Sequence, residues 1–91
     1  FMIKLFNLRK DFLKMKPNEK IRMLRESIDP KPSQTKIAEK LNIGQMTLSR
    51  IESGANEPNL KTLKAICELY NVSADYILGI IDEPRKIHDD K

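Results

Sequence analysis

The sequence predicts an all-α fold, a compact bundle of five helices that follows an N-terminal extension. Apolar residues recur at intervals of three and four from residue 19 onward, whereas no alternation with the period of two typical of a strand persists anywhere. The 91 residues suffice for one domain with a single core. We therefore expect an extension at residues 1–17, a helical domain at residues 18–81 and a polar tail at residues 82–91.

The first helix is expected to start at Glu19, because Pro17 stops the preceding segment and Asn18 is a favourable N-cap. Helical spacing brings three of its apolar residues to one side, namely Ile21, Leu24 and Ile28. Pro30 and Pro32 must end the helix, since a residue that precedes a proline is excluded from easy helical geometry.

Two short helices should follow, at residues 34–41 with Ser33 as the N-cap and at residues 45–53 with Gly54 after the last turn. A fourth helix is expected after Asn59. Its side chains at helical spacing are Leu60, Leu63, Ile66, Cys67 and Tyr70. Ser73 would cap a short fifth helix that carries Tyr76 and Ile77.

The segment at residues 34–54 meets the steric needs of two helices that cross steeply through a tight turn. A small residue must lie where the helices nearly touch, the turn needs a residue that tolerates positive φ, and apolar residues must anchor the second helix. These positions are occupied by Ala38, Asn42, Ile43, Leu48 and Ile51. This is the spacing of the helix-turn-helix, which reads DNA with its second helix.

The helix at residues 45–53 separates into two faces when it is drawn at about 100° per residue. The inward side would hold Thr47, Leu48 and Ile51, with Glu52 at the edge. The outward side would hold Gln45, Met46, Ser49, Arg50 and Ser53. Amide, guanidinium, hydroxyl and apolar groups are those that recognise base edges in the major groove, so this face is the candidate reading surface.

From Ile21 to Gly79 the sequence resembles the phage-repressor-like helix-turn-helix domains, the group of Cro, lambda-type repressor and the xenobiotic-response-element regulators. The resembling blocks are Leu24-Arg25, Ser33-Gln34, Ile37-Ala38-Glu39-Lys40-Leu41, Leu48-Ser49-Arg50-Ile51-Glu52-Ser53-Gly54, Pro58 and Tyr76-Ile77-Leu78-Gly79. The resemblance implies a lambda-repressor-like DNA-binding bundle. The stretch from Leu24 to Gln34 is two residues longer than the family pattern.

The resemblance also implies roles for individual residues. Gln34 would contact a phosphate and brace Gln45, while Arg25 and Glu52 would form a structural ion pair. The base-reading residues would be Gln45, Met46, Ser49 and Arg50. The phosphate contacts would come from Ser33, Gln34, Lys36, Thr47, Asn56 and Asn59.

The charge of the chain is uneven. Residues 1–50 hold 12 Lys and Arg against 5 Asp and Glu, whereas residues 51–91 hold 5 against 8. Residues 34–59 are formally neutral, so attraction to phosphate should come largely from the basic extension. We expect this extension to lie near the DNA backbone as an arm that carries Lys4, Arg9, Lys10, Lys14 and Lys16.

The sequence therefore predicts a transcriptional regulator, a repressor of bacterial or phage origin, that binds a two-fold symmetric double-stranded DNA operator as a homodimer. The dimer contact would come from the extension or from the C-terminal apolar residues Tyr76, Ile77, Ile80 and Ile81. Two alternatives stay open, an antitoxin that binds a toxin and represses its own operon, and a protein-interaction module that binds no DNA. RNA binding is disfavoured because few aromatic residues are available for stacking.

Other classes of site find little support. Cys67 is the single cysteine, so we expect no internal disulfide, and a cytoplasmic location, in the bacterial nucleoid or in a phage-infected host. His88 has no second His or Cys at metal-binding spacing, so neither a metal nor a cofactor is expected. No nucleophile and base stand in a catalytic pattern, and no segment is long enough to span a membrane, so we expect neither an enzyme nor a membrane partner.

Overall fold

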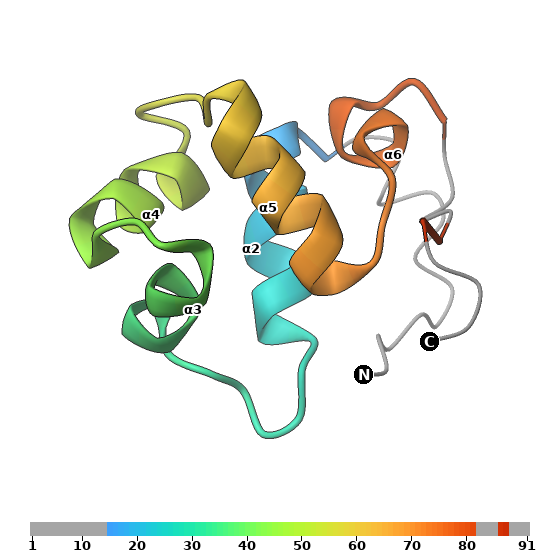
Figure 1. Ribbon diagram of the computed structural model, residues 1–91. Coiled ribbons are helices and arrows are strands. Elements are labelled where there is room, and N and C mark those ends of the chain that lie inside the picture. The colour runs from blue at the N-terminus through green and yellow to red at the C-terminus, as the bar shows by residue number, and fades with distance from the viewer. Residues whose placement is uncertain (1–14, 82–85, 88–91) are drawn as a thin grey trace.

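The computed structural model describes residues 15–81, 86 and 87, and within these residues all regular structure is helical. Five helices are present in this part of the chain, as predicted: α2 (Pro17–Glu26), α3 (Gln34–Leu41), α4 (Gln45–Ser53), α5 (Leu60–Tyr70) and α6 (Ala74–Leu78). Helices α3 and α4 lie together at one end of the molecule, α6 lies at the other, and α2 and α5 pass between them (Figure 1). None of these helices is long and apolar enough to cross a membrane.

Short polar side chains define where the helices begin and end. Ser33, Asn59 and Ser73 each accept a hydrogen bond from the backbone N–H three residues ahead, at 2.8–3.2 Å. Each such N-cap stabilises its helix by about 1 kcal/mol. At the C-terminal ends, Asn42 and Asn71 adopt left-handed backbone conformations with φ of 59° and 55°. The prediction that Asn42 supplies the positive φ of the turn is confirmed.

The prediction for the start of the first helix was wrong by two residues. Helix α2 begins at Pro17 and Lys16 is its N-cap, whose backbone N–H donates to the Glu19 carboxylate at 2.8 Å. Proline is well accommodated at the first helical position, because the N–H that it lacks would have no partner there. The expected boundary between residues 17 and 18 therefore falls within the first turn of α2. Asn18 has another role, since its side-chain amide donates to the backbone carbonyl of Glu52 at 3.2 Å.

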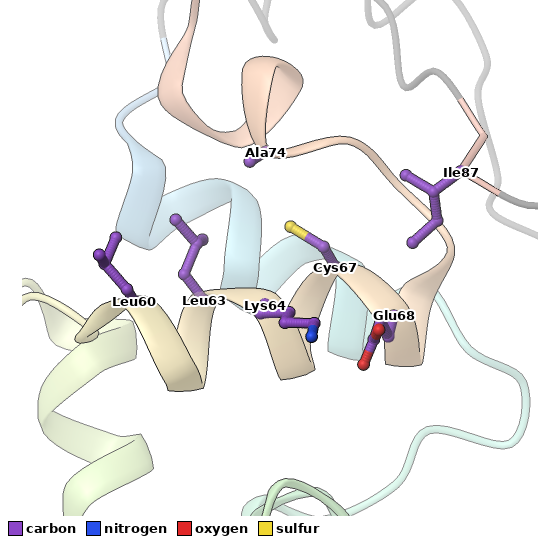
Figure 2. A pocket seen from close by; sticks show the side chains of 7 residues that line it. All are labelled: Leu60, Leu63, Lys64, Cys67, Glu68, Ala74 and Ile87. Carbon is purple, nitrogen blue, oxygen red and sulfur yellow. The ribbon is translucent and has the colours of Figure 1, made fainter.

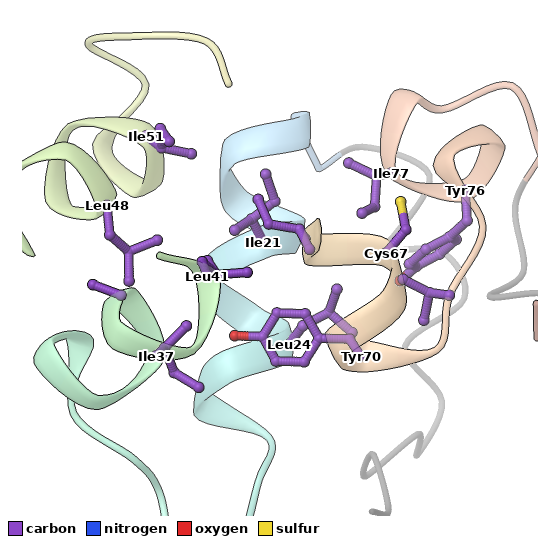
Figure 3. Packing of buried hydrophobic residues seen from close by; sticks show 13 residues of the cluster. Ile21, Leu24, Ile37, Leu41, Leu48, Ile51, Cys67, Tyr70, Tyr76 and Ile77 are labelled. Atoms are coloured by element: carbon purple, nitrogen blue, oxygen red, sulfur yellow. The ribbon is translucent and has the colours of Figure 1, made fainter. Parts of the chain in front are cut away.

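The core lies between the helices and draws side chains from all of them (Figure 3). It consists of Ile21, Leu24, Ile37, Ala38, Leu41, Leu48, Ile51, Ile66, Cys67, Tyr70, Val72, Tyr76 and Ile77. Ala38 is 2% exposed, and its small size permits the close crossing of α3 and α4 that the sequence predicted. Leu48 and Ile51 anchor α4 to this core, which sets the direction of the opposite face of the helix.

Four positions differ from the predicted pattern of burial. Ile28 lies beyond the end of α2 and is only partly buried, because the helix stops at Glu26. Thr47 is exposed rather than inward, whereas Glu52 is buried instead of lying at the edge of α4. The periodicity of apolar residues could not anticipate a buried carboxylate. Leu60 is 84% exposed, because it stands at the start of α5, outside the core.

A buried lysine connects the first helix to the last. Lys20 of α2 is 3% exposed, and its Nζ donates to the backbone carbonyl of Tyr76 at 2.7 Å. The same ammonium group lies 4.8 Å from the centroid of the Tyr76 ring, within the range of a cation–π contact. Burial lowers the pKa of Lys20. The amine thus satisfies a carbonyl of the short helix α6 and holds this helix against α2.

Because Tyr70 and Tyr76 are buried, we predict that the protein loses stability at alkaline pH. Burial raises the pKa of Tyr76 to about 12 and also raises the pKa of Tyr70, from an ordinary value of 10.0. Between pH 10 and 12 the unfolded chain loses the tyrosine protons that the folded chain keeps, so the free energy of unfolding falls by about 1.4 kcal/mol per pH unit for each tyrosine. Lys20, whose pKa is lowered in the folded chain, makes the free energy of unfolding rise with pH, but only below its ordinary pKa of 10.5. Urea titrations between pH 9 and 12 should therefore show a loss of several kcal/mol.

Tyr76→Phe and Tyr70→Phe serve as controls for this effect. Each should reduce the slope of stability against pH above pH 10, even if the substitution lowers stability at pH 7. Equal stability of the unsubstituted protein at pH 9 and pH 11.5 would contradict the prediction.

Candidate nucleic-acid interface

The turn between α3 and α4 exposes one face of α4. The backbone N–H of Ile43 donates to the carbonyl of Ala38 at 3.0 Å, which closes the end of α3 before the chain reverses. Because Leu48 and Ile51 face the core, the opposite side of α4 faces away from the bundle. The base-reading candidates all lie on this side: Gln45, Met46 and Arg50 are exposed, with Met46 at 63%, and Ser49 is partly buried.

A buried ion pair connects α2 to α4 beneath this face. Arg25 and Glu52 are only 7% and 4% exposed. The Nε and Nη2 atoms of Arg25 each donate to a Glu52 carboxylate oxygen at 2.9 Å, a bidentate arrangement. The third donor of the guanidinium group, Nη1, reaches the carbonyl of Pro32 at 3.1 Å. Hydrogen bonding to Glu52 raises the pKa of Arg25, so the arginine stays charged at any physiological pH.

Two glutamine side chains extend this pair toward the surface. Gln34 Nε2 donates to Glu52 Oε1 at 3.0 Å, and Gln45 Nε2 donates to Gln34 Oε1 at 3.0 Å. An ionised carboxylate only accepts hydrogen bonds, so Gln34 must turn its NH₂ group toward Glu52 and its oxygen toward Gln45. The charge of Glu52 therefore sets the orientation of both amides. We call Arg25, Glu52, Gln34 and Gln45 the polar relay.

The polar relay leaves defined groups of Gln45 available. Its NH₂ group uses one hydrogen on Gln34 and keeps the other, while its carbonyl oxygen forms no hydrogen bond within the described part of the chain. A donor and an acceptor presented side by side match N7 and the N6 amino group of adenine in the major groove. Arg50, on the same exposed side, has a guanidinium that forms no ion pair with the described residues and is suited to guanine.

The phosphate candidates come from the starts of α3, α4 and α5 and from the loop after α4. Lys36 and Thr47 are exposed in the first turns of α3 and α4, and Asn56 is exposed in the loop after α4. The side chains of Ser33 and Asn59 act as N-caps and accept hydrogen bonds from backbone N–H groups at 3.1 and 2.8 Å. They therefore have fewer hydrogen-bonding groups left for a phosphate. Of the proposed basic arm, Lys16 is exposed, whereas Lys4, Arg9, Lys10 and Lys14 lie outside the described residues.

The sequence did not predict two supports of the site. The segment with Pro30 and Pro32 was interpreted only as a helix breaker, yet the carbonyl of Pro32 accepts from Arg25. Asn18 was interpreted as a cap, yet its side chain bonds the end of α4 and lies 3.2 Å from where a Cβ atom at Gly54 would stand, at a residue whose φ is 86°. A backbone carbonyl carries no side-chain signal, and the distance of 34 residues from Asn18 to Glu52 hides their contact.

A separate apolar hollow lies along α5. Its volume is about 370 Å³, and Figure 2 shows Leu60, Leu63 and Cys67 along one side of α5, facing Ala74 and Ile87. None of the predicted base-reading or phosphate residues lines it. The described residues contain no group of three His, Cys, Asp or Glu side chains placed to hold a metal ion.

The polar relay predicts that a single substitution lowers the free energy of unfolding much more than a double substitution that removes both charges. Arg25→Met leaves the Glu52 carboxylate buried without its cation, and should lower the free energy of unfolding by about 3–5 kcal/mol. Arg25→Met combined with Glu52→Leu removes both charges and should recover most of this loss. Urea denaturation measures both, and a double variant no more stable than the single one would contradict the prediction.

Comparison with known proteins agrees with this geometry. A family model described as helix-turn-helix matches residues 21–77. The chain is 49% identical over 47 residues to the HTH-type transcriptional regulator ImmR of Bacillus subtilis, a match that covers 52% of this chain and 37% of that protein. It is 35% identical over 66 residues to the uncharacterized HTH-type transcriptional regulator YobD of the same organism, which covers 72% of this chain and 57% of the relative.

A third relative is the HTH-type transcriptional activator BcrR of Enterococcus faecalis, 34% identical over 65 residues that cover 71% of this chain and 31% of that protein. The matches thus span between about a third and somewhat more than half of the relatives' lengths. No solved structure matches the chain. Since the family model covers more than half of the residues, the chain belongs to the Cro/C1-type helix-turn-helix family of DNA-binding transcription regulators.

Proposed function

We propose that this chain binds double-stranded DNA in a sequence-dependent manner, with α4 in the major groove, and that it regulates transcription. The observation that carries the proposal is the polar relay, which holds Gln45 in one orientation on the exposed side of α4 beside Met46 and Arg50. A side chain fixed before binding loses less conformational entropy when it meets a base. The names of the three relatives, all transcriptional regulators of bacteria, support the regulatory part.

We infer repression in a bacterial cell or its phage as the direction of control. A protein that occupies promoter DNA excludes polymerase by its bulk, whereas activation requires an additional favourable contact with polymerase. The bacterial cytoplasm, where the DNA lies, is the expected location. Reporter expression is measured, with and without the protein, from a promoter that overlaps a DNA site bound by the protein. A fall in expression would indicate repression and a rise activation.

The proposed arrangement gives Gln34 a second task. Its side chain stands between Glu52 and Gln45, and its position in the first residue of α3 places it near the free N–H groups of that helix. Helix N-termini attract phosphate through these N–H groups and the helix dipole. A phosphate bound there would fix the position of the protein along the DNA backbone, at the point where Gln45 enters the major groove.

We call the exposed side of α4 that carries Gln45, Met46, Ser49 and Arg50 the reading face. Substitutions there should change specificity rather than general affinity. Gln45→Ala should reduce discrimination at one A·T pair by about 1–3 kcal/mol, and Arg50→Ala should do the same at one G·C pair. Gln34→Leu should reproduce part of the Gln45 effect, because the amide of Gln45 would lose its support. The site is obtained first by selection from a random duplex pool, and anisotropy titrations then compare it with single-base variants.

Lys64→Ala is the matched control for Arg50→Ala, since it also removes one exposed positive charge but lies on the hollow of α5. It should leave the base preferences unchanged. If Gln45→Ala and Arg50→Ala weakened binding to every duplex equally, α4 would not be the reading helix.

We also propose that the chain acts as a homodimer, because a single module makes few base contacts. Tyr76 and Ile77 are fully buried in the core and cannot form the contact, which removes half of the expected C-terminal surface. The apolar residues Leu78 and Ile80, which are 52% and 68% exposed, remain available for the contact.

Leu78→Glu combined with Ile80→Glu should therefore weaken self-association and operator affinity without unfolding the domain, since both side chains are exposed. Sedimentation equilibrium over a range of concentrations measures the dimer, and circular dichroism checks the fold. A mass that stays monomeric at all concentrations, with one protein bound per operator, would contradict the proposal.

A further inference from the structure

A second open groove lies on the side of α3 that faces the loop from α2. It has a volume of about 470 Å³, within the range of pockets that hold ligands. Its floor is apolar and comes from three elements, with Ile28 of the loop, Ile37 of α3 and Leu69 of α5. Pro30 and Pro32 complete the wall on the loop side. This loop joins the ends of α2 and α3 at the edge of the bundle (Figure 1).

The rim of this groove carries positive charge only. Lys31, Lys36 and Lys40 line it, and no carboxylate does. All three lysines are exposed, and none forms an ion pair with a residue in the described part of the chain. Lys36 and Lys40 stand one turn apart on α3, so their ammonium groups follow one edge of the groove, while Lys31 lies on the opposite loop.

The groove and Gln34, which supports Gln45 of α4, lie on different sides of α3. Ser33, Lys36, Ile37 and Lys40 follow the helical spacing of one stripe, which faces the groove. Gln34 lies outside this stripe and bonds α4 through Gln45. A ligand could therefore occupy the groove while α4 remains free.

We propose that this groove binds an acidic segment of a partner protein, with an apolar side chain seated on the partly buried Ile28 and Leu69, above the buried Ile37, and carboxylates beside the lysines. The combination of floor and rim selects this class of partner. A DNA backbone would satisfy the lysines but has no apolar side group for the floor. A neutral apolar segment would fill the floor but would leave three ammonium groups without counter-charges.

The test uses a short fluorescein-labelled peptide of aspartate and glutamate around a central Leu-Phe pair, titrated against the full chain at physiological salt. Saturable binding is expected, with chemical-shift changes centred on the methyl groups of Ile28, Ile37 and Leu69. Lys31→Glu combined with Lys40→Glu should weaken binding by about tenfold or more, because two attractive charge contacts become repulsive.

Lys61→Glu combined with Lys64→Glu makes the same change in net charge on exposed residues of α5 and should leave the peptide affinity within about twofold. A second peptide, with serine in place of Leu and Phe, should bind at least about tenfold more weakly, since it cannot bury apolar surface on the floor.

Three results would overturn the proposal. The first is the absence of saturable binding, and the second is equal binding of the two peptides, which would indicate general attraction between charges. The third is a loss of affinity for the selected duplex in the Lys31/Lys40 variant that matches the loss for the peptide, which would assign the groove to DNA. Retained duplex binding together with lost peptide binding supports a separate protein-docking surface.

Discussion

The structure depends on one buried carboxylate. Glu52 stands where α2, α3 and α4 meet, and it accepts hydrogen bonds from Arg25 and from Gln34. A carboxylate that is 4% exposed is stable there only if these donors are present, so the positions of the three helices are tied to each other. The same charge determines the orientation of the Gln34 amide and, through it, that of Gln45. A feature needed for folding therefore also orients Gln45 on the proposed reading face.

This pairing changes the electrostatic picture of the helix-turn-helix. Residues 34–59 are formally neutral, but the charge of Glu52 is balanced internally by Arg25. What remains toward solvent is Lys36, Lys40 and Arg50 against Glu39 and Glu57, all of them exposed. The solvent-exposed part of residues 34–59 is thus weakly positive rather than neutral, although Lys36 and Lys40 line the groove and only Arg50 belongs to α4. So small a charge would attract phosphate only weakly, which is consistent with the proposal that further basic residues or a second copy contribute to DNA affinity.

The base-reading candidates, the groove and the hollow lie on different parts of the surface, although the groove shares Ser33 and Lys36 with the phosphate candidates. The proposed reading face belongs to α4, the lysine-rimmed groove lies between α3 and the loop before it, and the apolar hollow follows α5. Helix α3 separates the first two surfaces, because successive stripes of one helix point in different directions. Arg25 also contacts the loop at Pro32, so the wall of the groove is connected to the ion pair beneath the reading face.

The sequence by itself determined the helices, the tight turn and the direction of α4. These follow from local rules: capping residues, the positive φ of Asn42, and the spacing of Ala38, Leu48 and Ile51. The ion pair between Arg25 and Glu52 came from a family resemblance, and its complete burial was not expected from periodicity. Only the tertiary structure decided which residues at the edge of an apolar helix face were exposed, as Thr47 and Leu60 are. It also decided which backbone carbonyl or side-chain amide completed each polar contact. The groove likewise brings together Ile28, Ile37 and Leu69 from three elements, and contacts between distant segments depend on how whole helices pack rather than on any local pattern of residues.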